Sequence, residues 1–170
     1  MKLNLGCNTR IREGYVNVDK DKYPGVDVVT DVSKLPFPDN YADEVYVSHI
    51  LEHFPHTKTV DVLKEWHRIL KPGGMLKIAV PDFARTIELY YKTGLCDWIV
   101  NYLWGDQIYE GANHYCGFDE ARLRKMLKLA GFTDIARVEN LPGYQEDECS
   151  TNVSNLDGKP VSLNMVAIKE

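Results

Sequence analysis

The sequence predicts an α/β fold built on a mainly parallel β-sheet. Short β-branched strands alternate with amphipathic helices along most of the chain, a glycine turn closes the first strand, and an acidic residue stands at the end of each of the next two. The 170 residues, of which 44% are hydrophobic and 26% charged, match one ordinary globular domain covering 1–170. We expect the sheet to be covered on both faces, as parallel sheets are.

Seven strands are predicted from alternating or β-branched apolar residues. The turn Gly6–Asn8 follows the first strand, and Pro81 interrupts the fifth. A long polar loop separates the last two. The predicted strands are Lys2–Leu5, Tyr15–Asp19, Val26–Thr30, Asp43–Ser48, Met75–Val80, Ile135–Val138 and Leu163–Ile168.

Three helices are predicted from apolar residues at helical spacing. The first spans Thr59–Leu70 and is stopped by Lys71–Gly74. Asp82 caps the second, Asp119 caps the third, and the stretch 94–117 is expected to be partly helical, as a lid or a substrate-side insertion. The residues expected to share one face are Val60, Leu63, His67 and Leu70 in the first helix and Phe83, Ile87, Tyr90 and Tyr91 in the second. Those expected to face inward in the third helix, which ends at Gly131, are Leu123, Met126, Leu127 and Ala130.

The composition excludes several classes of protein. A net charge of −5 without a run of Lys and Arg argues against nucleic acid as a partner. No apolar stretch is long enough to span a bilayer, and no signal peptide is recognisable. Cys7, Cys96, Cys116 and Cys149 show neither a CxxC pair nor zinc-ligand spacing, so we expect reduced thiols in a cytoplasmic protein.

Polar residues stand at the ends of the first four predicted strands, where ligands bind in parallel α/β sheets. They are Gly6–Asn8, Asp19, Asp31, and Ser48 with His49. A glycine lets the backbone approach a ligand closely, and Asn tolerates a left-handed conformation. A carboxylate at the end of the second strand can accept both hydroxyls of a ribose, so Asp19 is a candidate for that contact and Asp31 for an adenine amino group.

With these residues the chain resembles the class I S-adenosylmethionine-dependent methyltransferases, and most of all the compact type found among polysaccharide-biosynthesis proteins. The resemblance rests on LNLGCNTRIREGYVNVD near the start and on SHILEHF followed by LKPGG, and it extends over most of the sequence. It implies a Rossmann-like sheet with strand order 3-2-1-4-5-7-6 and an antiparallel last strand. It also implies S-adenosylmethionine as the cofactor.

The resemblance gives each residue at the strand ends a role toward the cofactor. The implied contacts are Gly6, Cys7 and Asn8 with its amino acid end, Asp19 with its ribose, Asp31 and Val32 with its adenine, and Ser48 and His49 with its sulfonium. Arg10 and Arg12 are candidates for the cofactor carboxylate. Solvated loop arginines are the common alternative.

The chain departs from the family at its first loop. The usual Gly-x-Gly-x-Gly is reduced to Gly6–Arg10, and the helix that follows it is compressed into Thr9–Gly14, too short for a normal helix. The N-terminal helical region is therefore shortened. The same change argues against an NAD enzyme, which needs a helix N-terminus at its pyrophosphate, whereas S-adenosylmethionine has no phosphate.

Glu52, His53 and His114 are the candidate catalytic residues. Glu52 and His53 follow the fourth strand, where the methyl group would be presented, and His114 could close over the site from the aromatic insertion. In one interpretation, His53 is a general base that Glu52 orients or assists. In the other, Glu52 and His53 are loop residues that only cap or solvate the turn. The Glu-His pair is also similar to that of ubiquinone-pathway O-methyltransferases, with which a metal has been associated, but we expect no metal here.

The expected function is methyl transfer from S-adenosylmethionine to an O or N nucleophile of a small molecule or glycan. Such transfer depends mostly on proximity and alignment, so it does not require an evident base. A cofactor-binding or regulatory protein of the same fold without catalysis is the alternative. The aromatic residues that could stack on a sugar ring, or equally form core or a homodimer surface, are Trp98, Tyr102, Trp104, Tyr109 and Tyr115.

Overall fold

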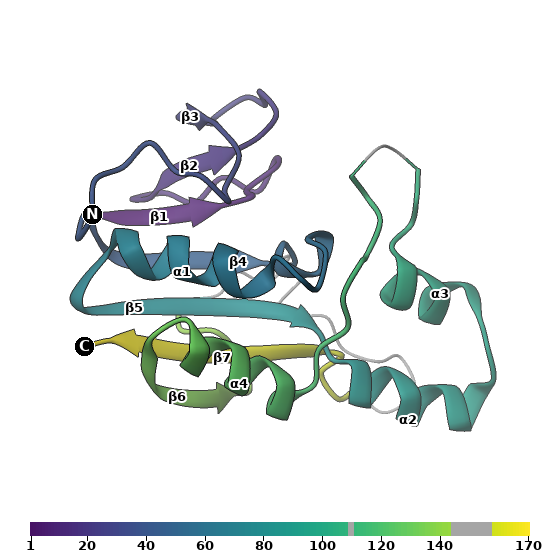
Figure 1. Cartoon of the computed structure of the whole chain (residues 1–170). Helices are drawn as coiled ribbons and strands as arrows, with labels where there is room; N and C mark the ends of the chain where they lie inside the picture. The colour runs from purple at the N-terminus through teal and green to yellow at the C-terminus, as the bar shows by residue number, and fades with distance from the viewer. Residues whose placement is uncertain (109–110, 144–157) are drawn as a thin grey trace.

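A computed structural model, which describes residues 1–108, 111–143 and 158–170, contains the predicted sheet (Figure 1). Its seven strands follow the order β3-β2-β1-β4-β5-β7-β6, which confirms the expected order. Strand β7 is antiparallel to both of its neighbours, and the other described pairs are parallel. The strands are β1 Lys2–Leu5, β2 Val16–Asp19, β3 Val28–Val29, β4 Ala42–Ser48, β5 Leu70–Pro81, β6 Phe132–Val138 and β7 Ser162–Lys169.

Three strands, β3, β5 and β6, differ from their predicted lengths by three residues or more, and β6 begins at Phe132 instead of Ile135. Strand β3 keeps only Val28–Val29, because it is the edge strand and pairs with β2 through those residues alone. Strand β5 begins at Leu70 instead of Met75. Ala42 pairs with Leu70 and Glu44 pairs with Met75, so Lys71–Gly74 form a bulge within β5. These residues were predicted to lie between the first helix and the strand.

The helices begin where their predicted caps lie. The side chain of Asp82 accepts a hydrogen bond of 3.1 Å from the backbone N of Arg85, and Asp119 accepts one of 2.7 Å from Arg122 N. Gly131, at φ 103°, follows the last helix in the left-handed conformation. The helices are η1 Leu51–His53, α1 Thr59–Ile69, α2 Phe83–Thr93, α3 Asp97–Trp104 and α4 Glu120–Leu129.

The inner face of α1 is rotated from the predicted one. Its buried apolar residues are Val62, Leu63, Trp66 and Ile69, whereas Val60 and His67, predicted on one face with Leu63, are half-buried. Trp66 decides this rotation, because its large ring is fully buried and its Nε1 donates a 2.9 Å hydrogen bond to the carbonyl of Val32. Leu70 is buried as predicted, but as the first residue of β5.

The predicted apolar stripe of α2 does not form the buried face of the helix. Phe83, Tyr90 and Tyr91 are 44%, 44% and 82% exposed, and the buried apolar residue of the helix is Leu89. Leu89 packs with Ile99 of α3 and not on the sheet. Figure 1 shows why: α2 and α3 lie beyond the end of β5, where no strand face is available to cover the aromatic side chains. In α4, by contrast, Leu123, Leu127 and Ala130 are buried as predicted and Met126 is half-buried.

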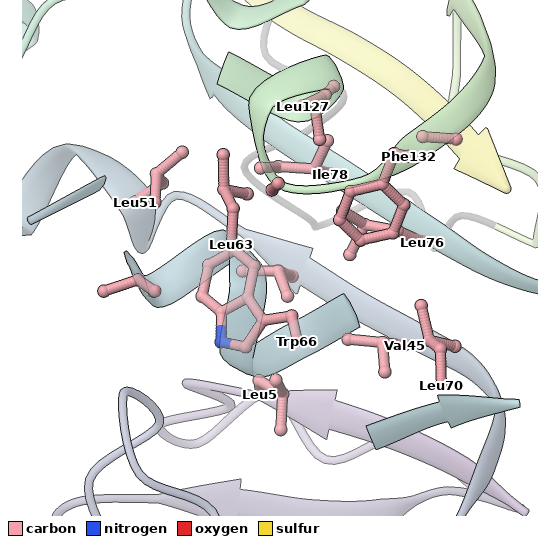
Figure 2. Packing of buried hydrophobic residues seen from close by; sticks show 14 of the residues in the cluster. Leu5, Val45, Leu51, Leu63, Trp66, Leu70, Leu76, Ile78, Leu127 and Phe132 are labelled. Carbon is pink, nitrogen blue, oxygen red and sulfur yellow. The ribbon is translucent and has the colours of Figure 1, made fainter. Parts of the chain in front are cut away.

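One hydrophobic core lies between the sheet and helices α1 and α4, which contact each other on the same face (Figure 1). Figure 2 shows Leu63 and Trp66 of α1 and Leu127 of α4 gathered around Leu76 and Ile78 of β5. The expectation that helices cover both faces is wrong for the described residues. The cluster on the other face consists of Tyr46, Ala79 and Leu141 with half-buried neighbours, none of them helical, and no helix forms between β1 and β2.

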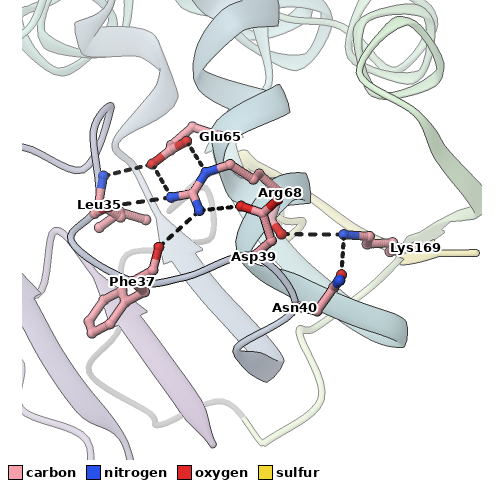
Figure 3. A network of polar contacts seen from close by, with 7 residues as sticks. All are labelled: Leu35, Phe37, Asp39, Asn40, Glu65, Arg68 and Lys169. Atoms are coloured by element: carbon pink, nitrogen blue, oxygen red, sulfur yellow. Dashed lines mark hydrogen bonds and ion pairs between the residues drawn. The ribbon is translucent and has the colours of Figure 1, made fainter.

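A polar network joins the loop before β4 to α1 (Figure 3). The guanidinium of Arg68 donates to the carbonyls of Leu35 and Phe37 and pairs with Glu65 and Asp39 at 2.8 Å. Glu65 also accepts from Leu35 N at 2.7 Å. The network thereby fixes the loop that continues from the end of β3. No described helix is long and apolar enough to cross a membrane.

Candidate functional site

A cleft of about 650 Å³ opens at the carboxyl ends of β1, β2 and β4, as predicted for a parallel sheet. Every predicted site residue lines it except Glu52, which is fully buried beside it. The predicted residues that line the cleft are Gly6, Cys7, Asn8, Arg10, Asp19, Asp31, Val32, Ser48, His49, His53 and His114.

The turn after β1 requires a glycine. Gly6 has φ 68°, and a Cβ at this position would lie 2.1 Å from Ile50 Cδ1. Its backbone N donates a 2.8 Å hydrogen bond to Val18 O, which attaches the turn to the end of β2. Asn8 follows at φ 47°, a conformation that Asn tolerates better than most residues. The turn therefore brings its backbone against the cleft.

Asp19 connects the turn to the cleft. It is 7% exposed and accepts hydrogen bonds from the backbone N of Asn8, at 2.7 Å, and of Asp21, at 2.9 Å. An ionised carboxylate offers about four lone-pair sites, so these two bonds leave acceptor capacity toward the cleft. This geometry is compatible with the predicted ribose contact.

Asp31 and Val32 border the cleft beyond β3. Asp31 is exposed, and its Oδ1 accepts a 2.8 Å hydrogen bond from Ser33 N. Val32 is buried, and its carbonyl is held by Trp66. An apolar wall with an exposed carboxylate at its edge suits a planar base that carries an amino group.

The two loop arginines have different surroundings. Arg10 is exposed at the cleft. Arg12 is buried, with its guanidinium carbon 5.0 Å from the ring centre of Tyr15 and 4.0 Å from that of Tyr46, and it donates to the carbonyl of Gly143. Arg12 therefore also packs against the sheet face that no described helix covers.

Asn4 and Asn17 were not predicted as site residues, yet they shape the shortened loop. Asn4 Nδ2 donates to Asn17 Oδ1 and to the carbonyl of Arg10, both at 2.9 Å, and Asn17 Oδ1 accepts from Arg12 N at 2.9 Å. Both asparagines are buried. Their signal in the sequence is a polar residue in the middle of each of two short apolar strands. The predictions also missed Lys20, Asp21, Tyr23, Asn101 and Asp106 in the cleft lining.

Cys7 lines the cleft as a thiol and not as a thiolate. Burial first, and then the charge of Asp19, raise the pKa of Cys7 to about 11. The described cysteines Cys7, Cys96 and Cys116 are free, and Cys149 lies outside the described residues.

Three histidines surround the buried carboxylate of Glu52. His49, at φ 55°, has Nδ1 3.2 Å from Glu52 Oε1 and Nε2 2.9 Å from Ser162 Oγ. The rings of His53 and His114 lie edge to face with centres 4.9 Å apart. Burial raises the pKa of Glu52, but His49 and the charges of His53 and His114 outweigh burial and hold the pKa below its usual value.

The tautomers of the two candidate bases follow from their partners. Nδ1 of His53 lies 3.0 Å from the carbonyl of Asn113, and Nδ1 of His114 lies 3.0 Å from the carbonyl of Tyr102. A carbonyl only accepts, so each Nδ1 carries the proton and each neutral ring keeps Nε2 as an acceptor. Asn113, and not Glu52, therefore orients His53, which corrects the predicted pairing. Burial is the main reason that the pKa of His114 is lowered.

Glu52, His53 and His114 are also residues of the kind that bind divalent cations. One oxygen of Glu52 and one nitrogen of each ring all lie within 4.8 Å of one another. That a metal plays no part stays a prediction.

The predicted aromatic cluster divides in two. The ring centres of Trp98 and Tyr102 lie 6.3 Å apart, and both side chains pack against the buried cluster of Leu89, Ile99 and Val161. Trp104 and Tyr115 are 48% and 55% exposed. Tyr109 lies outside the described residues.

Residues 7–78 match the family described as a methyltransferase domain. The ubiquinone/menaquinone biosynthesis C-methyltransferase of Burkholderia mallei is 30% identical over 155 residues, which cover 80% of this chain and 60% of that protein. The chain is thus similar to the class I S-adenosylmethionine-dependent methyltransferases. It spans about 60% of the length of these curated methyltransferase relatives.

Solved structures of methyltransferases share the fold. A methyltransferase of Methanosarcina mazei superposes with a TM-score of 0.63 at 20% identity, over 99% of this chain and 91% of that one. The 1,6-didemethyltoxoflavin-N1-methyltransferase of Burkholderia thailandensis, solved with its substrate and S-adenosylhomocysteine, superposes with a TM-score of 0.60 at 19% identity, over 99% of this chain and 70% of that one. At these identities the methyltransferase structures establish the fold alone.

Proposed function

We propose that the chain transfers a methyl group from S-adenosylmethionine to an O or N nucleophile of a small molecule or glycan. The observation that carries the proposal is the single cleft that joins the Gly6 turn and Asp19 at one end to His53 and His114 at the other. Its volume of about 650 Å³ lies within the ordinary range for ligand sites.

Asp31 and Val32 would hold the adenine of the cofactor, and Asp19 would hold its ribose. The backbone of the turn Gly6–Asn8 would contact its amino acid end, where Arg10 would supply a positive charge for the carboxylate. Ser48 and His49 would lie on the side of its sulfonium. The acids at successive strand ends and the buried position of Asp19 support this order.

In the reaction the nucleophile forms a bond to the methyl carbon while the carbon–sulfur bond breaks and its electron pair stays on sulfur. S-adenosylhomocysteine leaves, and the proton of the nucleophile passes to Nε2 of His53 or His114. Both rings carry their proton on Nδ1, so Nε2 is the acceptor in either case. Glu52 stabilises the resulting imidazolium through its negative charge.

Calorimetry with S-adenosylhomocysteine, followed by turnover of S-adenosylmethionine on a panel of hydroxyl, amine and activated-carbon acceptors, tests the proposal. Carbon acceptors are included because the Burkholderia mallei relative is named a C-methyltransferase. His53→Ala and His114→Ala should keep S-adenosylhomocysteine affinity, and at least one should lose about 10²–10⁴-fold in turnover. Turnover within a few-fold of the parent in both variants would leave alignment alone as the source of catalysis.

A cofactor-binding or regulatory protein without catalysis is the competing function. It predicts S-adenosylhomocysteine binding with no turnover on the whole panel. No binding of S-adenosylhomocysteine at about millimolar concentration would reject both functions, because each requires the cofactor site.

A further inference from the structure

A second hollow continues from the far end of the cleft. It has a volume of about 420 Å³ and shares Pro81, Tyr102 and His114 with the cleft. One side is formed by α2, through Phe83 and Ile87, and the other by the end of α3 and the residues 114–117. We call this hollow the α2–α3 groove. It meets the cleft at His114, one of the two candidate bases.

The groove differs from the cleft in its chemistry. The cleft is lined by acids and cations, among them Arg10, Asp19 and Lys20. Among the described residues that line the groove, none is Asp, Glu, Lys or Arg, and its walls carry the rings of Phe83, Trp104 and Tyr115. An ionic group entering the groove would lose water without gaining a partner.

The aromatic walls stay accessible to solvent. Phe83, Trp104 and Tyr115 are 44%, 48% and 55% exposed. Large apolar side chains gathered around one hollow are typical of a ligand site, because a folded chain otherwise buries them. Burial is the main cause that lowers the pKa of His114, at the junction with the cleft, and it favours the neutral ring.

We propose that the α2–α3 groove is the acceptor subsite and that it takes an uncharged, flat aromatic compound whose hydroxyl or amino group reaches His114. This proposal rests on the methyl transfer proposed above. It restricts the acceptor to a small molecule and excludes a glycan. A sugar ring also stacks on aromatic side chains, but its hydroxyls need polar partners. Thr86, the hydroxyl of α2 in the groove, already donates to the carbonyl of Asp82 at 2.8 Å.

Three probes distinguish the acceptor classes in calorimetry on the full chain saturated with S-adenosylhomocysteine. They are 2-naphthol, its charged analogue 6-hydroxy-2-naphthoate, and methyl β-glucopyranoside. We expect 2-naphthol to bind at least about tenfold more tightly than either of the others, because only 2-naphthol is both flat and uncharged. Equal or tighter binding of the naphthoate or the glucoside overturns the proposal, and so does no binding of 2-naphthol.

A filling substitution locates the site. Ile87→Trp places a large ring in the groove, away from the cleft lining, and should weaken 2-naphthol binding at least about tenfold while S-adenosylhomocysteine affinity is unchanged. Tyr91→Trp, on the same helix but 82% exposed and outside the groove lining, is the matched control and should bind 2-naphthol as the parent does. Phe83→Ala removes one wall of the groove and should also weaken 2-naphthol binding. This variant replaces Ile87→Trp in the test if Ile87→Trp fails to fold.

Unchanged 2-naphthol affinity in a folded Ile87→Trp or Phe83→Ala variant overturns the groove assignment. Failure of this inference differs from failure of the proposed function. If S-adenosylhomocysteine does not bind the parent in a titration of its own, methyl transfer is rejected. If it binds and the groove variants have no effect, only the acceptor subsite is rejected.

Discussion

Replacing Asp19 by Asn tests the ribose contact with the smallest change in shape. The carboxylate is nearly buried and already accepts from the backbone N of Asn8 and Asp21, so its remaining acceptor sites face the cleft. Asn keeps one acceptor oxygen and replaces the other with a donor, which cannot accept from a ribose hydroxyl. A hydrogen bond to a charged group is worth about 1.5–3 kcal/mol, so losing one raises the Kd of S-adenosylhomocysteine about 10- to 150-fold.

Calorimetry of S-adenosylhomocysteine against the parent, Asp19→Asn and Asp31→Ala measures this effect. Asp31→Ala should cost less, because the exposed Asp31 contact is partly replaceable by water. Asp61→Asn, an exposed acid on α1 outside the cleft, is the control and should leave the Kd unchanged. If a folded Asp19→Asn variant binds S-adenosylhomocysteine within about twofold of the parent, Asp19 serves the turn alone and the ribose assignment is rejected.

Three further predictions concern stability and can be measured by denaturant unfolding. Gly6→Ala should lower the unfolding free energy by about 1–3 kcal/mol, because its Cβ would overlap Ile50; an unchanged midpoint would mean that the turn relaxes freely. Arg68→Ala should cost about 1.5–3 kcal/mol, because it leaves half-buried Glu65 without its cation; a cost below about 0.5 kcal/mol would show that solvent replaces the network. Burial, and then the charge of Lys169, lower the pKa of His67 in the folded chain from 6.5. As the pH drops below about 6.5, the unfolded chain therefore binds the proton more readily than the folded chain does, and the unfolding free energy falls. His67→Gln should remove that part of the pH dependence, and an unaltered slope in the variant would contradict this prediction.

The features of the structure that were predicted correctly from the sequence are those set by local chemistry. Gly6 and Asn8 need left-handed backbone, and Asp82 and Asp119 cap helices through donors three residues away. The common position of the cleft residues followed from the rule that parallel strands end at one edge. The strand order came from the resemblance to the family, since hydrophobic periodicity does not say which strands are neighbours.

What only the tertiary structure decided is which partner each side chain meets. The stripe of Phe83, Tyr90 and Tyr91 has helical spacing, yet it is exposed because α2 lies beyond the strand ends. Glu52 stands beside His53 in sequence, but it lies nearest His49, while His53 is held by Asn113 from a segment far along the chain. Periodicity describes one element at a time, whereas burial and hydrogen bonding depend on what the other elements bring to its surface.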